Sequence, residues 1–143
     1  MQRVRSPEQR DQGLNDFMAS LPEAVKQYYK DAYLQDFPGF VNECMGSPKG
    51  KTDAWWLNNF CVHPERQRQG IGRRLLEIVR QKVDSHLSPT CEGEGQVVAL
   101  SATRDVNAPV YKAYGFEQKG LKKMLSPWGD WPLYVFVLDA GCQ

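Results

Sequence analysis

Apolar residues in the first third of the chain recur at helical spacing and predict helices over residues 1–48. A first apolar face consists of Leu14, Phe17, Met18 and Leu21. A second face follows Pro22 at the i, i+3, i+4, i+7 and i+8 positions, which hold Val25, Tyr28, Tyr29, Ala32 and Tyr33. We interpret the tyrosines as a packing face. We expect Pro38 to break this helix and a short third helix to end at Gly46.

After residue 48 the pattern changes to short apolar runs separated by turn residues and by one long amphipathic segment. The predicted strands are Ala54–Val62, Gln96–Ser101, Glu117–Leu125 and Leu133–Leu138, and the predicted helices are Gly70–Asp84 and Asn107–Tyr114. The predicted connections are Ser47–Asp53, Ser88–Gly95 and Ser126–Pro132. A β-α-β-α-β-β order is typical of an α/β (α+β) fold, with a mixed sheet flanked by helices, parallel crossovers first and a hairpin last.

Length and charge narrow the class of protein. A chain of 143 residues fits one domain over 1–143 that buries its own core. A net charge of +1 removes the argument for bulk attraction to nucleic acid or to acidic membranes. The longest purely apolar run, Leu133–Leu138, has six residues, whereas a membrane span needs about 20. The polar start of the chain does not resemble a signal peptide, so we expect a cytoplasmic protein.

The cysteines and histidines form no metal-binding pattern. Cys44, Cys61, Cys91 and Cys142 are scattered, and the histidines are His63 and His86. No C-x-x-C pair occurs, and no histidine stands at ligand spacing from a cysteine. We therefore expect no metal and reduced thiols in a reducing cytosol.

The most informative segment joins the first predicted strand to the long helix. It contains Gln67-x-x-Gly70-x-Gly72, so glycines stand where the helix begins. Backbone N–H groups at a helix start lack intrahelical acceptors, the helix dipole is positive there, and glycine lets an anion approach closely. Residues 63–82 also carry six basic and two acidic side chains. The segment therefore predicts a phosphate-binding loop.

A second motif raises the specificity of this interpretation. Residues 107–116 indicate a short helix with Asn107 as its N-cap and Gly115 as its stop, with Tyr111 between them and Phe116 after it. The two motifs, in this order and each beside a predicted strand, resemble the GNAT superfamily of N-acetyltransferases. The resemblance covers about residues 54–143, which would form the acetyl-CoA-binding core after a helical segment at 1–48.

The resemblance implies acetyl-CoA as cofactor and acetyl transfer to a small-molecule or peptide amine by direct attack within a ternary complex. It implies that the loop amides hold the pyrophosphate, and that the pantetheine arm runs along the strand ending at Val62. Tyr111 matches the family's general acid, whose phenol protonates the leaving thiolate. The implied cofactor-binding residues are Phe60, Cys61, Val62, Gln67, Arg68, Gln69, Gly70, Ile71, Gly72, Arg73, Asn107 and Tyr111.

The general base is not identifiable from the sequence. Many members of the family use a carboxylate on the strand that corresponds to Ala54–Val62, but this strand has Asn58 and Asn59, which cannot act as bases. Nearby titratable candidates are Asp53, His63 and Asp130, with no geometric support from the sequence. Cofactor binding is therefore better supported than catalysis.

A second departure lies at the N-terminus, where the family has three strands and two helices before the strand at Ala54. Residues 1–53 have helical patterns instead and resemble the helical insert of some fungal members. We therefore expect a GNAT-like sheet without its first three strands. This leaves open a catalytically idle CoA-binding or interaction module, whose exposed sheet edge at Ala54–Val62 invites self-association. Nucleic-acid binding through a basic helix at Arg66–Lys82 has weaker support, because acidic residues interrupt it.

Overall fold

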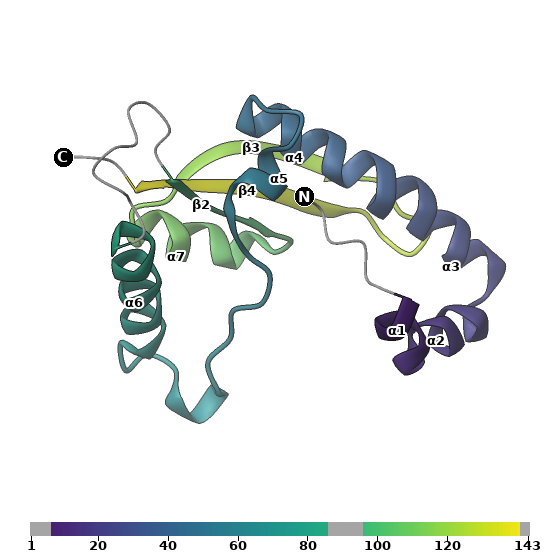
Figure 1. Ribbon diagram of the computed structural model, residues 1–143, viewed down its shortest axis with the longest axis horizontal. Coiled ribbons are helices and arrows are strands. Elements are labelled where there is room, and N and C mark those ends of the chain that lie inside the picture. Colours follow the sequence, from purple (N-terminus) through teal and green to yellow (C-terminus); the bar gives the residue numbers. More distant parts are fainter. Residues whose placement is uncertain (1–6, 86–95, 141–143) are drawn as a thin grey trace.

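The computed structural model describes residues 7–85 and 96–140, and a four-stranded mixed sheet forms its centre (Figure 1). Its strands are β1 (Trp55–Leu57), β2 (Gln96–Ala102), β3 (Glu117–Met124) and β4 (Trp131–Ala140), in the spatial order β1-β2-β4-β3. β1 and β2 are parallel, β2 and β4 are antiparallel, and β3 and β4 form a hairpin. The predicted fold class and order of elements are confirmed. The predicted loop Ser88–Gly95 lies outside the described residues.

Helices cover both faces of this sheet. α4 (Phe37–Met45) lies on one face, and α6 (Ile71–Ser85) and α7 (Ala108–Ala113) lie on the other (Figure 1). Because strand residues alternate between faces, β4 contributes to both layers. The buried cluster on the N-terminal side is Ala32, Phe37, Val41, Met124, Leu133 and Val135. The cluster on the other side is Leu76, Val83, Val98, Leu100, Ala102, Ala108, Tyr111, Phe116 and Phe136.

The N-terminal segment is helical, as predicted, and its described residues 7–53 contain no strand. Its elements are α1 (Pro7–Gln9), η1 (Arg10–Leu14), α2 (Asn15–Ser20), α3 (Glu23–Tyr28), η2 (Tyr29–Asp36), α4 (Phe37–Met45) and α5 (Gly50–Asp53). The last of these is a short helix inside the predicted linker. Gly46 ends α4 with a left-handed φ of 64°, as predicted.

The prediction that Pro38 breaks the helix is wrong. The backbone stays helical from α3 through η2 into α4, and the Phe37 N–H donates to the Ala32 carbonyl, five residues back. These wide π-type turns leave space for the proline ring and remove the need for its missing N–H. The helical backbone is therefore continuous from Glu23 to Met45, and its α4 part packs against the sheet.

The contact between α4 and β3 is close. A Cβ atom at Gly120 would collide with the Cys44 Sγ and lie 2.9 Å from the Phe40 ring, so a larger residue requires these side chains to move. The Trp131 Nε1–H donates to the Tyr28 hydroxyl at 2.7 Å, which confirms a packing role for that tyrosine. Tyr33, in contrast, is 49% exposed.

None of the helices in the described part of the chain is long and apolar enough to cross a membrane. Among the described residues, no group of three His, Cys, Asp or Glu side chains could hold a metal ion. Cys44 and Cys61 are free thiols.

Candidate functional site

The site begins where β1 leaves the sheet. The predicted strand Ala54–Val62 is much shorter in the structure, because pairing ends where Leu57 meets Leu100. The next residues, Asn58 and Asn59, are exposed and have a low preference for strands. β2 continues to Ala102 without this neighbour. The two strands therefore diverge, and the backbone after Leu57 has no hydrogen-bonding partner on β2.

Glutamine side chains brace the loop that follows. The loop contains the short helix η3 (Pro64–Arg66). The Gln67 Nε2 donates to the Val62 carbonyl at 3.0 Å, and the Gln69 Nε2 donates to the Glu65 carbonyl at 3.2 Å. Both hydrogen bonds join a glutamine side chain to a backbone carbonyl of the same loop and so stabilise its conformation. The motif glutamines thus have a structural task that the sequence pattern did not predict.

Left-handed backbone conformations set the shape of this loop. Arg68 has φ 61°, and no other described non-glycine residue has a positive φ. Such a residue costs about 1 kcal/mol or more and is typical of ligand-binding turns. Gly70 has φ 78°, which glycine adopts without strain. The loop therefore holds a strained backbone at the entrance to α6.

The first turn of α6 presents unused backbone donors. The N–H of Arg74 donates to the Gly70 carbonyl at 3.0 Å, which begins the helical bonding pattern. The N–H groups of the three preceding helical residues have no intrahelical acceptor. The helix dipole places about half a positive charge there, and the Arg66 and Arg68 side chains add to it. This end of α6 can bind an anion.

A cavity of about 610 Å³ joins this loop to α7. Most of the predicted cofactor residues line it, namely Phe60, Cys61, Val62, Gln67, Arg68, Gly70, Ile71, Gly72, Asn107 and Tyr111. Gln69 and Arg73 do not line it. The lining residues absent from the prediction are Arg66, Val106, Val110 and Tyr114. Their only sequence signal is their position next to the motifs.

Gly72 lies in the cavity wall between Phe60 and Tyr114. A Cβ atom at this position would lie 3.4 Å from the Phe60 ring and 3.4 Å from the Tyr114 hydroxyl, which is ordinary van der Waals contact. Packing alone would therefore also admit a small side chain. The sequence predicts this glycine as a place where a ligand approaches the backbone, and the structure places it in the lining of the cavity.

Tyr111 lies where the core meets the cavity. It is 9% exposed, and its ring lies 5.8 Å from Phe116 and 5.5 Å from Phe136. Burial raises the pKa of its phenol above the ordinary value. Its hydroxyl has no partner among the described residues, and no described side-chain polar atom is both fully enclosed and unpartnered. The neutral hydroxyl is therefore available to a ligand in the cavity.

Asn107 does not cap α7, which corrects the predicted N-cap. It has helical φ and ψ of −85° and −23°, and its side chain makes no capping hydrogen bond. The preceding turn, η4 (Asp105–Asn107), is held instead by the Tyr134 hydroxyl, which donates to Asp105 Oδ1 at 2.8 Å. This bond raises the pKa of Tyr134. The Asn107 amide is thereby left free to face the cavity.

None of the candidate bases lines the cavity. Asp130 accepts from the Ser126 N–H at 3.0 Å and pairs with Lys123 at 2.8 Å, which together lower its pKa. It therefore stabilises the β3–β4 turn. His63 lies in the exposed loop, and Asp53 lies exposed at the end of α5. The lining residues include no carboxylate and no histidine among the residues that the structure describes.

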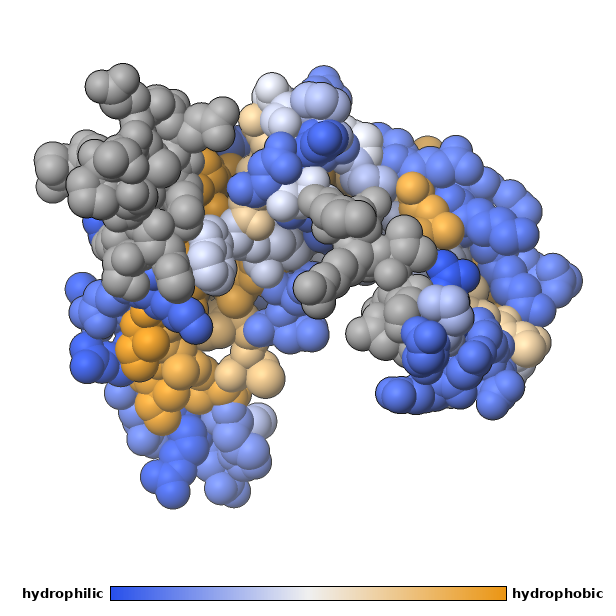
Figure 2. All heavy atoms as spheres, viewed as in Figure 1, coloured by the Kyte–Doolittle hydropathy of each residue, from blue (hydrophilic) through white to orange (hydrophobic). Residues whose placement is uncertain are grey.

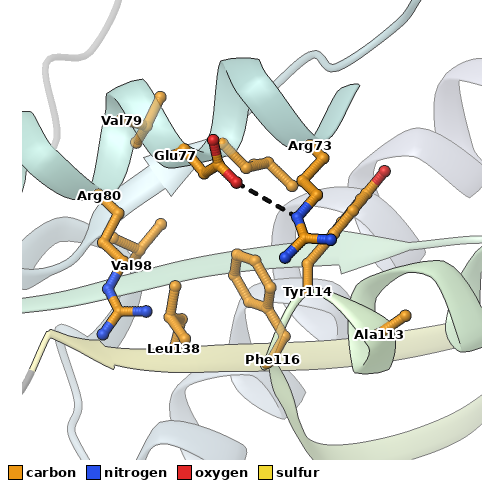
Figure 3. Close-up of a pocket in the computed structure, with 11 residues that line it drawn as sticks. Arg73, Glu77, Val79, Arg80, Val98, Ala113, Tyr114, Phe116 and Leu138 are labelled. Carbon is orange, nitrogen blue, oxygen red and sulfur yellow. Dashed lines mark hydrogen bonds and ion pairs between the residues drawn. The ribbon is translucent and has the colours of Figure 1, made fainter. Parts of the chain in front are cut away.

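A second cavity of about 320 Å³ lies between α6 and the α7–β3 junction (Figure 3). Arg73, Leu76, Glu77 and Arg80 form its helical wall, and Phe116 and Leu138 lie opposite them. Arg73, predicted as a cofactor-binding residue, lies here. Tyr114 lines both cavities.

Comparison with known families identifies the class of protein. The family model of the acetyltransferase (GNAT) domain matches residues 28–118, which is more than half of the chain. The chain therefore belongs to the GNAT superfamily of acyltransferases.

One structural neighbour is the ribosomal-protein-S18-alanine N-acetyltransferase from Escherichia coli. It is 23% identical to this chain, with a TM-score of 0.48, and the similarity covers 62% of this chain and 55% of the neighbour. The chain thus spans about half the length of that enzyme. No curated protein matches the sequence.

Proposed function

We propose that this protein is an N-acetyltransferase that moves an acetyl group from acetyl-CoA to an amine by direct attack within a ternary complex. The observation that supports this most is the single cavity shared by the Gln67–Gly72 loop, the start of α6 and Tyr111. We further propose that residues 1–143 act as one domain, with the cofactor site in 54–143, and that it works in the cytoplasm.

The residues of the cavity fit the proposed cofactor. The free N–H groups at the start of α6 and the charges of Arg66 and Arg68 suit the pyrophosphate. The backbone between Asn58 and Val62 has no β2 partner, so it can bond the amides of the pantetheine arm as a neighbouring strand would. The Asn107 amide faces the same space from the other side.

Acetyl-CoA supplies the acetyl group as a thioester when bound. A backbone N–H near Val62 would stabilise the carbonyl oxygen as the amine adds to the carbon. Tyr111 would donate its proton toward the sulfur as the thiolate leaves, because its raised pKa keeps the phenol neutral at physiological pH. The amine proton would pass to solvent, since no described base lines the cavity.

The same lack of a base supports a second candidate, a CoA-binding module without turnover. In that case the cavity binds the cofactor, and the acceptor amine is never deprotonated in place. The open edge of β1 would then serve as a contact surface. Both candidates need cofactor binding, and they differ only in chemistry.

Thiol release separates the two candidates. Acetyl-CoA is mixed with the protein and a panel of small amines and peptides, and free CoA thiol is followed over time. The acetyltransferase predicts amine-dependent release that falls about 100-fold in Tyr111→Phe with cofactor affinity unchanged. Binding of acetyl-CoA without release, equal in the two proteins, would favour the module instead.

A further inference from the structure

We propose that the second cavity receives the adenosine end of coenzyme A, and that Arg80 pairs with the phosphate on the ribose 3′ oxygen. This inference rests on the proposed function, because it extends the same cofactor site. Beyond its pyrophosphate, coenzyme A consists of a flat purine and a 3′-phosphate. A matching site needs an apolar surface for the ring and a cation for the phosphate.

The position of the cavity suits this end of the cofactor. Tyr114 lines both cavities, and Gly72 of the first is followed directly by Arg73 of the second. A pyrophosphate bound at the first turn of α6 would therefore leave the adenosine beside the same helix. Arg80 lies seven residues after Arg73, about 10 Å further along the helix axis.

One face of α6 is directed at this cavity. Arg73, Leu76, Glu77 and Arg80 all line it, at the i, i+3, i+4 and i+7 positions that share a helical face. In Figure 3, the Arg80 guanidinium lies to the left and the Arg73 guanidinium to the right of Phe116 and Leu138. The cavity thus has apolar side chains with a cation on either side of them.

The ion pairs around this cavity leave the Arg80 guanidinium available to a ligand. Glu77 also lines the cavity, but its carboxylate pairs with Arg73 at 3.2 Å and with Arg74 at 3.5 Å. The negative charge of Glu77 is thereby offset by two guanidinium groups. Arg80 pairs with no carboxylate among the described residues. A dianionic phosphate would give it the bidentate partner that a guanidinium prefers.

The floor of the cavity suits an aromatic ring. Phe116 and Val98 are only 4% and 2% exposed, so they back the cavity from the core, and the half-buried side chains of Tyr114 and Leu138 supply accessible apolar surface. Gly115, with φ 88°, turns the chain so that Phe116 enters the core directly after α7. The volume of about 320 Å³ lies at the lower end of the range for small-molecule sites and fits one end of a long cofactor.

The experiment compares two ligands that differ only in the proposed contact. Coenzyme A and dephospho-coenzyme A, which lacks the 3′-phosphate, are titrated calorimetrically into wild-type protein and variants. We expect the wild type to bind coenzyme A about tenfold more tightly, as one charge-assisted hydrogen-bonded pair allows. In Arg80→Gln the two ligands should bind equally, and Arg80→Lys should keep part of the preference.

Arg74→Gln is the matched control, since it removes the same charge from the same helix at a residue that does not line the cavity. It should keep the tenfold preference. The inference is overturned if the wild type binds both ligands equally, or if Arg80→Gln keeps the preference. If the wild type binds neither ligand, the proposed function itself fails, which is a different result. Circular dichroism confirms that each variant is folded, and Arg80→Lys provides a second variant.

Discussion

Two neighbouring loop residues adopt left-handed backbone conformations for different reasons. Gly70 adopts φ 78° without cost, whereas Arg68 is held at φ 61° against the preference of its side chain. We interpret the second as strain kept because the loop must direct its amides and the Arg68 charge into one cavity. Strain and charge can be separated at this position.

Arg68→Gly and Arg68→Ala test this interpretation as a pair. Both remove the guanidinium and should weaken acetyl-CoA binding by about three- to tenfold. Only the glycine variant also relieves the backbone, so it should be more stable than the alanine variant by about 1 kcal/mol. Denaturant melts and calorimetric titration measure the two effects. Equal stability of the pair would show that φ 61° is not strained.

Tyr111 gives a prediction about alkaline pH. Burial raises its pKa, so the folded state disfavours the phenolate relative to the unfolded chain. Stability is therefore intact below the ordinary tyrosine pKa of about 10 and falls as the pH rises through the folded-state pKa. Between about pH 9 and about pH 11, the melting temperature of Tyr111→Phe should fall less than that of the wild type. Tyr134→Phe is the control, because the pKa of Tyr134 is raised mainly by its hydrogen bond to Asp105 and not mainly by burial. An unchanged loss in Tyr111→Phe would mean that the phenol is well solvated.

At the residue scale, the motifs predicted most of the cavity lining but not how it is built. Gly72 was predicted from the motif, but its place between Phe60 and Tyr114 in the cavity wall depends on residues more than ten positions away. Asn107 was predicted as a cap from its type and position, but a preceding helical turn makes that cap unnecessary. The surroundings of Gly72 and Asn107 cannot be predicted from the spacing of residues along the chain.

The site depends on where two secondary-structure elements end. One strand ends earlier than the sequence predicts, and one helix continues further. β1 stops at Leu57 and so opens the space for a ligand, and α4 continues past Pro38 and so covers the hairpin. Local propensity predicted the strand too long, because Phe60 to Val62 are apolar and include an aromatic and a β-branched residue, while the polar Asn58 and Asn59 interrupt the pairing. It predicted the helix too short, because π-type turns have no clear sequence pattern.

Gly120 tests the contact between α4 and the sheet. Gly120→Ala would place a Cβ atom in collision with the Cys44 Sγ and 2.9 Å from the Phe40 ring, so it should destabilise the fold by about 1–3 kcal/mol. Adding Cys44→Ala removes the sulfur but not the ring, and it should restore part of the loss. Urea denaturation of the single and double variants measures this. Equal loss in Gly120→Ala with and without Cys44→Ala would mean that the helix does not lie against β3 at this place.

The molecule as a whole has two exposed features that favour association, an open strand edge and an apolar helix surface. β1 ends the sheet, and Trp55 on it is 40% exposed. Figure 2 shows apolar side chains gathered over α6, where Leu75 is 42% and Ile78 is 48% exposed. Unpaired backbone groups at a strand edge and exposed apolar surface each favour association. Self-association was predicted from the sequence, and here it stays a prediction.

Light scattering tests that prediction at the scale of the whole molecule. We expect the mass to rise above 16.3 kDa as concentration increases. Ile78→Lys, which places a charge on the apolar surface of α6, should return the mass to that of one chain. A constant monomer mass in the wild type would contradict self-association, and a mass unchanged by Ile78→Lys would exclude the α6 surface as the contact.

The proposed cofactor site depends most on the phosphate-binding loop, and one matched pair of variants tests this loop directly. Gly70→Asp and Gly70→Asn have the same shape, and aspartate and asparagine both tolerate the left-handed backbone at φ 78°, but only aspartate adds a negative charge. Calorimetric titration with acetyl-CoA should show saturable one-to-one binding by the wild type. Gly70→Asp should bind at least about tenfold more weakly than Gly70→Asn. Equal affinities for the two variants, or no binding by the wild type at millimolar ligand, would contradict the account.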